Sequence, residues 1–297
     1  MQIRVLGSRA GGGLPQWNCG GTYSVRARRG DPDVPPRTQP SIAVSARGET
    51  WSVINASPDI RDQFARFSGL HPRPGTRDLP LDTVVLTNAD LDHTLGLLIL
   101  RESLPYRIAS TPWVRETILA NNAAFRLMEP AWGTVELDTG FPLAAKGELE
   151  ARFFPVPGKV PSYLGQLAVN RADTTVGLRI TDTRSGQRLV YAAGIQSLDG
   201  GTMAEFEAAD CRFVDVTFYT PDVLLTMRRG APDAHAMGHL PVGGEGGSLE
   251  RLQGLPGRSL YIHLNNTNPM LDRASPEAAS VRDAGLEIAF DGMEIEL

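Results

Sequence analysis

Short apolar segments occur in pairs along this chain, each pair joined by a tight turn, and helical patterns separate the pairs. The paired segments are Ser41–Ser45 with Glu49–Asn55, Val176–Thr181 with Arg188–Ala192, and Leu286–Phe290 with Met293–Leu297. The last pair flanks Asp291-Gly292, a dipeptide that favours a two-residue β-hairpin. Strand groups that alternate with helices, twice over, predict an α/β protein with two sheets and helices on the outside.

The helix boundaries and the composition indicate how this chain is divided. Thr111-Pro112 and Ser275-Pro276 each place a capping residue before a first-turn proline, and Gly285 ends the second of these helices. The 297 residues are 41% hydrophobic, which is enough for a sizeable core. No repeat or interdomain linker interrupts the pattern, so we predict a single domain spanning residues 1–297.

Charge and hydropathy exclude several classes of partner. A net charge of −5 and a pI near 5.6 argue against a nucleic acid held by a general basic field. The apolar run Leu95–Leu100 is stopped by Arg101, and no run approaches the length that crosses a bilayer. A strand-like pattern begins directly at Gln2, without a signal-peptide pattern. We therefore expect a cytoplasmic protein that acts on a small molecule, with no nucleic-acid partner and no membrane partner.

Three residues of metal-ligand type stand together in one predicted turn. Asp90, Asp92 and His93 follow the apolar strand predicted at Leu81–Thr87 and precede an apolar helical run at Thr94–Leu100. An aspartate that caps the following helix would account for one of the three. Packing gives no reason for the other two, so the segment favours a metal site.

Further polar residues stand at other strand ends and in a glycine-flanked loop. Asp215 ends a short apolar strand at Arg212–Val214, His263 ends another strand, and His239 follows Gly238. Taken alone, each is ordinary, because aspartates cap turns and loop histidines are commonly exposed. Open α/β proteins, however, build sites beyond the carboxyl ends of their strands, and the recurrence favours one shared site. His71 lies in a polar loop and is predicted to be a surface residue.

The order of Asn88, Asp90, Asp92, His93, Asp215, His239 and His263 resembles the metallo-β-lactamase superfamily, whose first motif is His-x-His-x-Asp-His. Within it, the chain resembles the family of pyrroloquinoline quinone (PQQ) biosynthesis proteins known as PqqB. The matching segments run in the family's order, from residue 3 to residue 297: the Gly7–Cys19 segment with its three consecutive glycines, Arg37-Thr38-Gln39, Asn55–Ile60, Asp92-His93 with Gly96-Leu97-Leu98, Met237-Gly238-His239, and His263-x-Asn265-Asn266-Thr267-Asn268-Pro269. The resemblance implies a metallo-β-lactamase-like four-layer αββα sandwich.

The resemblance also implies one metal site and not two. Asn88 and Asp90 stand where the superfamily's first two histidines would be, so the first site has lost its imidazoles. The second set survives as the metal ligands we assign, namely Asp92, His93, Asp215 and His263. Two imidazoles and one or two carboxylates with open positions are what a non-haem Fe(II) oxygenase uses, although zinc would bind the same ligands.

The resemblance to the PqqB family implies an iron- and oxygen-dependent hydroxylase. Its substrate would be the tyrosine ring of a Glu–Tyr cross-linked diamino acid. We assign His239 as an acid/base or phenol-orienting group, because the pKa range of imidazole suits that role. Asn88 and Asp90 are assigned to orient substrate or water beside the metal. This interpretation is also compatible with a homodimer.

Two departures from the family pattern keep other functions open. Cys19 is followed by Gly20-Gly21 where the family has Cys-x-Cys-x-x-Cys, so we predict no structural zinc. Val216 replaces the glycine that commonly follows the strand-end aspartate, which allows a paralogue that acts on another peptide-derived natural product. The alternatives are a metal-dependent hydrolase or phosphodiesterase of the same fold, and a carrier that assists transport of PQQ or its precursor.

Overall fold

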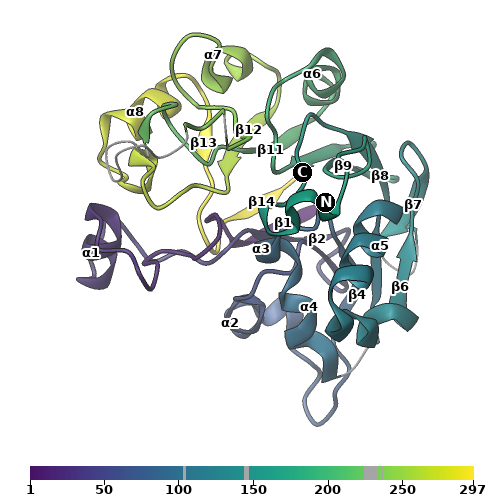
Figure 1. Ribbon diagram of the computed structural model, residues 1–297. Coiled ribbons are helices and arrows are strands. Elements are labelled where there is room, and N and C mark those ends of the chain that lie inside the picture. The colour runs from purple at the N-terminus through teal and green to yellow at the C-terminus, as the bar shows by residue number, and fades with distance from the viewer. Residues whose placement is uncertain (103–104, 144–146, 224–232, 236) are drawn as a thin grey trace.

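The computed structural model describes residues 1–102, 105–143, 147–223, 233–235 and 237–297. Two seven-stranded mixed sheets form the centre of the fold (Figure 1). The first sheet has the order β14 (Glu294–Glu296), β1 (Gln2–Gly7), β2 (Ser41–Ser45), β3 (Trp51–Ile54), β4 (Leu81–Val85), β5 (Arg107–Ser110) and β6 (Trp132–Thr134). The second has the order β13 (Glu287–Ile288), β12 (Arg258–Ile262), β11 (Cys211–Asp215), β10 (Arg188–Ala192), β9 (Val176–Asp182), β8 (Leu149–Pro155) and β7 (Gly140–Leu143).

Each sheet is antiparallel at one end and parallel at the other. Strands β3 to β6 are parallel in the first sheet, and strands β10 to β13 are parallel in the second. The predicted hairpins β2–β3 and β9–β10 are present as antiparallel pairs. Because β11 and β12 run in parallel as neighbours, the residues that follow them emerge at the same edge of the sheet.

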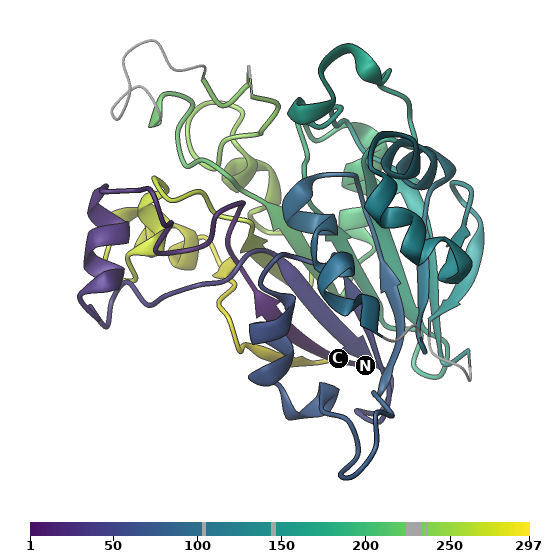
Figure 2. The same ribbon diagram turned by 60° about the horizontal axis from the view of Figure 1, so that its bottom comes forward.

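Three apolar layers hold the sheets and helices together. The inner faces of the two sheets share one core, in which Ile54 and Val85 pack with Tyr191 and Phe213. Outside the first sheet lie α2 (Ile60–Ala65), α4 (Gly96–Ile99), α5 (Pro112–Asn121) and the 3-10 helix η3 (Ala123–Ala131), and outside the second lie α6 (Gly200–Glu207), α7 (Ser248–Leu252) and α8 (Pro276–Asp283) (Figures 1 and 2). The predicted αββα sandwich is confirmed.

The remaining helical elements are short. They are α1 (Thr22–Arg28), α3 (Leu91–Thr94), η1 (Ser68–Leu70), η2 (Leu100–Glu102), η4 (Ser162–Leu167) and η6 (Pro269–Leu271). Thr111 and Ser275 cap α5 and α8 as predicted, since each side chain accepts a hydrogen bond from the third residue after it. Among the described helices, none combines the length and the apolar character needed to cross a membrane.

The prediction of a C-terminal β-hairpin is wrong. Strand β13 pairs with β12 in the second sheet, whereas β14 pairs with β1 in the first, so Asp291-Gly292 connects the two sheets. The Asp291 carboxylate accepts hydrogen bonds from the backbone and side chain of both Ser8 and Thr38. These contacts with distant residues fix the direction of the chain, so the local turn preference does not produce a hairpin. The two chain ends lie side by side on the first sheet (Figure 2).

Candidate metal centre

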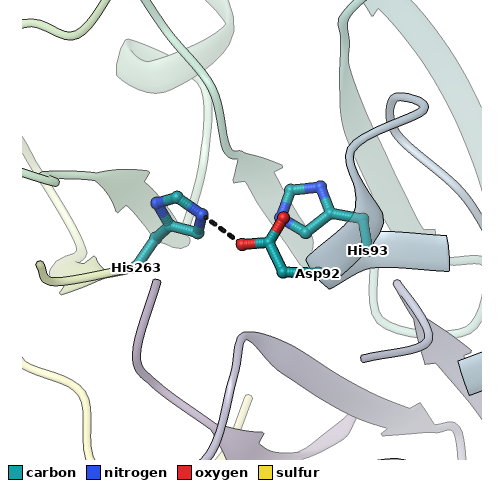
Figure 3. A group of neighbouring side chains, drawn as sticks. All are labelled: Asp92, His93 and His263. Atoms are coloured by element: carbon teal, nitrogen blue, oxygen red, sulfur yellow. Dashed lines mark hydrogen bonds and ion pairs between the residues drawn. The ribbon is translucent and has the colours of Figure 1, made fainter. Parts of the chain in front are cut away.

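Three side chains from two distant segments meet at one edge of the sandwich. Asp92 and His93 lie on α3, directly after β4, and His263 directly follows β12. Figure 3 shows the Asp92 carboxylate between the two imidazole rings. One ligand atom from each residue lies within 4.8 Å of the others. The strand-end placement that the sequence predicted therefore brings together three of the four assigned metal ligands.

The ring of His93 is fully buried and fixed in one orientation. Its Nδ1 lies 2.7 Å from Asn88 Oδ1, which also accepts the backbone N–H of Asp90 at 3.0 Å. The Asn88 oxygen is therefore the acceptor, and the His93 Nδ1–H group is the donor. The other nitrogen, Nε2, has no hydrogen-bond partner within the described part of the chain. A buried imidazole nitrogen with a free lone pair is what a metal ligand requires.

His263 is held from both sides of its ring. Its Nε2 lies 3.2 Å from Asp92 Oδ2, and its Nδ1 lies 3.1 Å from Thr217 Oγ1. The backbone φ of 66° is unusual for a residue other than glycine, which fits a position under functional constraint. Burial alone would lower the pKa of His263, but the neighbouring Asp215 and Asp92 carboxylates raise it well above its usual value. The raised pKa favours the doubly protonated ring, and a metal bound at Nε2 would displace the proton on that nitrogen.

Asp215 lies on the far side of the His263 ring from Asp92. Its Oδ1 is 3.4 Å from His263 Nδ1, so the group of three close ligands does not include it. The carboxylate accepts hydrogen bonds from Thr217 N–H and Oγ1–H, both at 2.9 Å, and from Gly194 N–H. Its observed contacts orient the imidazole, as carboxylates commonly do behind metal-bound histidines. Direct coordination of a metal by Asp215 stays a prediction.

His239 lies beside this group without joining it. Its Nδ1 is 3.0 Å from Thr217 Oγ1 and 3.8 Å from Asp215 Oδ2. Burial lowers the pKa of His239 to about 4, against the opposing effect of the Asp215 carboxylate. The ring is therefore neutral near pH 7, and Nε2 is the nitrogen that remains for a ligand in the cavity. The assigned acid/base role is compatible with this geometry and stays a prediction.

Asp90 is the N-terminal flanking residue of α3, but its side chain does not cap the helix. It accepts a hydrogen bond from Asn88 Nδ2 at 2.9 Å instead. Burial and the nearby Asp92 carboxylate raise the pKa of Asp90 to about 7. Asn88 thus links Asp90 to His93. Because the Asp90 side chain does not cap α3, helix capping does not explain why an aspartate stands here.

A cavity of about 230 Å³ opens onto these residues. It contains the predicted Asn88, Asp90, Asp92, His93, His239 and His263. It also contains residues that sequence reasoning did not assign, among them Lys159, Ser162, Thr217 and Asn265. Lys159 and Ser162 come from the Pro- and Gly-bounded segment at 155–170. The sequence does mark Lys159 as unusual, because the chain contains only two lysines among its 29 lysine and arginine residues.

The donor set fits a single metal ion. Two imidazoles and one carboxylate, with the remaining positions open to the cavity, suit Fe(II) in oxygenases and also suit zinc. The unpartnered Nε2 of buried His93 supports this assignment independently. Cys19 and Cys211 are both free thiols, and Cys19 Sγ accepts the backbone N–H of Gly21. The predicted absence of a structural zinc stays a prediction.

Comparison with known proteins agrees with this fold. Residues 50–264 match the family model described as a beta-lactamase superfamily domain, and the two-sheet fold with its metal-ligand cluster defines the same class. Coenzyme PQQ synthesis protein B of Pseudomonas putida (strain KT2440) is 40% identical over the full length of both chains. The protein of the same name from Rhizobium meliloti (strain 1021) is 42% identical, over 100% of this chain and 98% of that protein. The chain belongs to the coenzyme PQQ synthesis protein B family.

Solved structures give the same result. The crystal structure of Zn(2+)-bound PqqB from Methylobacterium extorquens has a TM-score of 0.94 and 39% identity, with full coverage of both chains. A diphosphatase from the PhnP family has a TM-score of 0.69 at 19% identity, covering 100% of this chain and 97% of that one. The second likeness shows the shared fold alone.

Proposed function

We propose that this protein acts in the biosynthesis of PQQ, by an iron- and dioxygen-dependent hydroxylation of the tyrosine ring of a Glu–Tyr cross-linked precursor. The observation that carries the proposal is the group Asp92, His93 and His263, two imidazoles and one carboxylate on one side of an open cavity. This is the donor set of non-haem Fe(II) oxygenases. The names of the 40%-identical relatives support the pathway.

In this proposal Asp92, His93 and His263 hold Fe(II), which when bound supplies the means to bind and activate dioxygen. Asn88 holds the His93 ring with Nε2 toward the cavity. Asp215 and Thr217 hold the His263 ring in the same way. Direct coordination by Asp215 is the second form of the proposal, based on the sequence pattern.

His239 is the group that we propose to act on the substrate phenol. It is neutral near pH 7 and lies beside the metal ligands, so it can accept the phenol proton. The Asp215 carboxylate behind Nδ1 would stabilise the imidazolium that results.

A metal-dependent hydrolase is the alternative that a specific observation favours. The related protein from Methylobacterium extorquens is described as Zn(2+)-bound, and the donors here suit zinc as well as iron. A hydrolase would need no dioxygen. Turnover of a generic phosphodiester by the zinc-loaded protein under nitrogen would support it and contradict the hydroxylase.

The ligand assignment has a direct test. The variants His93→Ala and His263→Ala should each lose bound metal and lose activity together, because each removes one imidazole from a group of three ligands. His71→Ala is the matched control, since His71 is exposed and its ring forms a hydrogen bond with the backbone carbonyl of Ala65, outside the metal-ligand group. Iron retained at the wild-type level in either site variant would overturn the assignment.

A further inference from the structure

Lys159 is a cation in the metal-site cavity with no ion-pair partner among the described residues. Many other cations of the chain are paired: Arg26, Arg47, Arg107, Arg179, Arg184 and Arg258 each form an ion pair with a carboxylate. The chain has only one other lysine, Lys146, which lies outside the described residues. An unpaired, half-buried ammonium group beside a catalytic centre requires an explanation other than surface solubility.

Hydrogen bonds hold the backbone of Lys159 and of the two residues before it. The carbonyl of Pro157 accepts the backbone N–H of Gln196 at 2.8 Å, and the carbonyl of Gly158 accepts Asn170 Nδ2 at 3.0 Å. The carbonyl of Lys159 itself accepts the Thr175 hydroxyl at 3.3 Å. The residue is therefore positioned by the folded scaffold, although it lies on a loop.

The stem of the side chain is also confined. A Cβ atom placed on Gly238 would lie 2.6 Å from Lys159 Cδ and 3.2 Å from its Cε, so the lysine stem passes directly over this glycine. Gly238 has a φ of 74°, a conformation that glycine adopts without strain. Gly238 directly precedes His239, so the lysine lies alongside the proposed acid/base residue.

Lys159 is a positive charge in a cavity whose other charged groups, apart from the histidines, are acidic. Asp90 and Asp92 line this cavity, and Asp215 lies behind the His263 ring. Lys159 is near enough for its positive charge to lower the pKa of both Asp90 and His239, although at Asp90 burial and the Asp92 carboxylate outweigh this effect. A substrate bound in this cavity would contact both the proposed metal ligands and the Lys159 side chain.

We propose that Lys159 binds a carboxylate of the substrate and so places the aromatic ring between His239 and the metal. This inference rests on the proposed function and deepens it, because it assigns the group that recognises the amino-acid end of the Glu–Tyr precursor. A lysine ammonium offers three donors to a carboxylate, and charge-assisted hydrogen bonds of this kind are strong. Lys159 is accordingly a positioning residue.

The test measures binding without turnover. Zinc-loaded protein is titrated anaerobically with the Glu–Tyr cross-linked diamino acid by calorimetry. Lys159→Gln should weaken binding by about 10- to 100-fold, the range expected when a charged hydrogen-bond partner is lost. Lys159→Arg should restore part of the affinity. Arg61→Gln, a variant of an exposed cation outside the cavity, is the matched control and should bind as the wild type does.

A second measurement begins with the wild type, and comparison with Lys159→Gln then assigns the effect to Lys159. Each carboxylate of the diamino acid is converted in turn to a carboxamide. One derivative should bind the wild type about 10- to 100-fold more weakly than the parent. The same derivative and the parent should bind Lys159→Gln equally.

Three results would overturn the proposal. The first is a Lys159→Gln variant that binds the diamino acid as tightly as the wild type, and the second is a carboxamide derivative that loses the same affinity in the wild type and in Lys159→Gln. The third is a wild type that shows no measurable binding of the diamino acid. The proposed hydroxylation is tested separately, by measuring oxygen insertion with the iron-loaded protein. Binding that depends on Lys159 without oxygen insertion would refute the hydroxylation and leave the carboxylate site standing.

Discussion

Asn88 should control metal affinity without touching the metal. Its Oδ1 accepts the Nδ1–H of His93, and both groups are buried. We consider Asn88→Leu, because leucine has a similar size but offers no acceptor and leaves little room for a replacement water. In this variant the buried Nδ1–H loses its partner, which costs about 1–3 kcal/mol.

That free energy translates into a measurable change in metal binding. In the metal-free variant the freed ring can turn or change tautomer, and metal binding must restore it, so a cost paid wholly on binding would weaken metal affinity about 5- to 150-fold. This agrees with the roughly 10- to 100-fold loss typical when the residue that orients a metal-bound histidine is removed. Competition for zinc against a chelator of known affinity measures the change directly.

The control is Gln63→Leu, which removes another buried amide. Gln63 forms hydrogen bonds with Thr38, Ser57 and the backbone of Gln39, and its side chain forms none with a histidine among the described residues. This variant should lower stability and leave zinc affinity unchanged. If Asn88→Leu folds and binds zinc as tightly as the wild type, the reasoning that Asn88 fixes the His93 ring is refuted.

Two predictions concern the scaffold. Hydrogen bonds from Arg184 hold the pKa of Asp182 below its usual value, so this stabilisation is present above the unfolded pKa of about 3.9 and is lost as pH falls. Asp182→Asn should therefore lower the unfolding free energy by about 1–3 kcal/mol at pH 7, and urea titrations at several pH values should show the difference shrinking toward pH 3. Asp291→Ala should destabilise by at least about 3 kcal/mol, because it leaves donors of Ser8 and Thr38 unpaired between the sheets. Thermal unfolding that is unchanged in Asp291→Ala would contradict the role given to this link.

Local sequence patterns were sufficient to predict those parts of the fold that neighbouring residues determine. The hairpin at 41–54 and the caps Thr111 and Ser275 depend on a few adjacent residues, and the structure has them as predicted. The metal-ligand cluster was also predictable, because polar residues at the ends of parallel strands meet at one edge of the fold. Asp92 and His93 lie far from His263 in the sequence, and the fold brings them together in this way.

The features that the sequence did not predict depend on contacts between distant segments. The Asp291-Gly292 turn favours a hairpin locally, but the contacts of Asp291 with Ser8 and Thr38 send β14 to the other sheet. Lys159 reaches the cavity only because Gln196, Asn170 and Thr175 hold its loop in place, and no local pattern indicates those partners. The position of Asp215 behind His263 likewise depends on Thr217 and Gly194.

The source of the inserted oxygen tests the central claim most directly. Protein reconstituted anaerobically with Fe(II) is given the Glu–Tyr cross-linked diamino acid, a reductant and heavy-isotope dioxygen in ordinary water, and the product is read by mass spectrometry. We predict that the product gains oxygen carrying the heavy isotope, and that His93→Ala gives none. Product oxygen derived from water, or turnover that proceeds without dioxygen on zinc alone, would contradict the hydroxylase and favour the hydrolase.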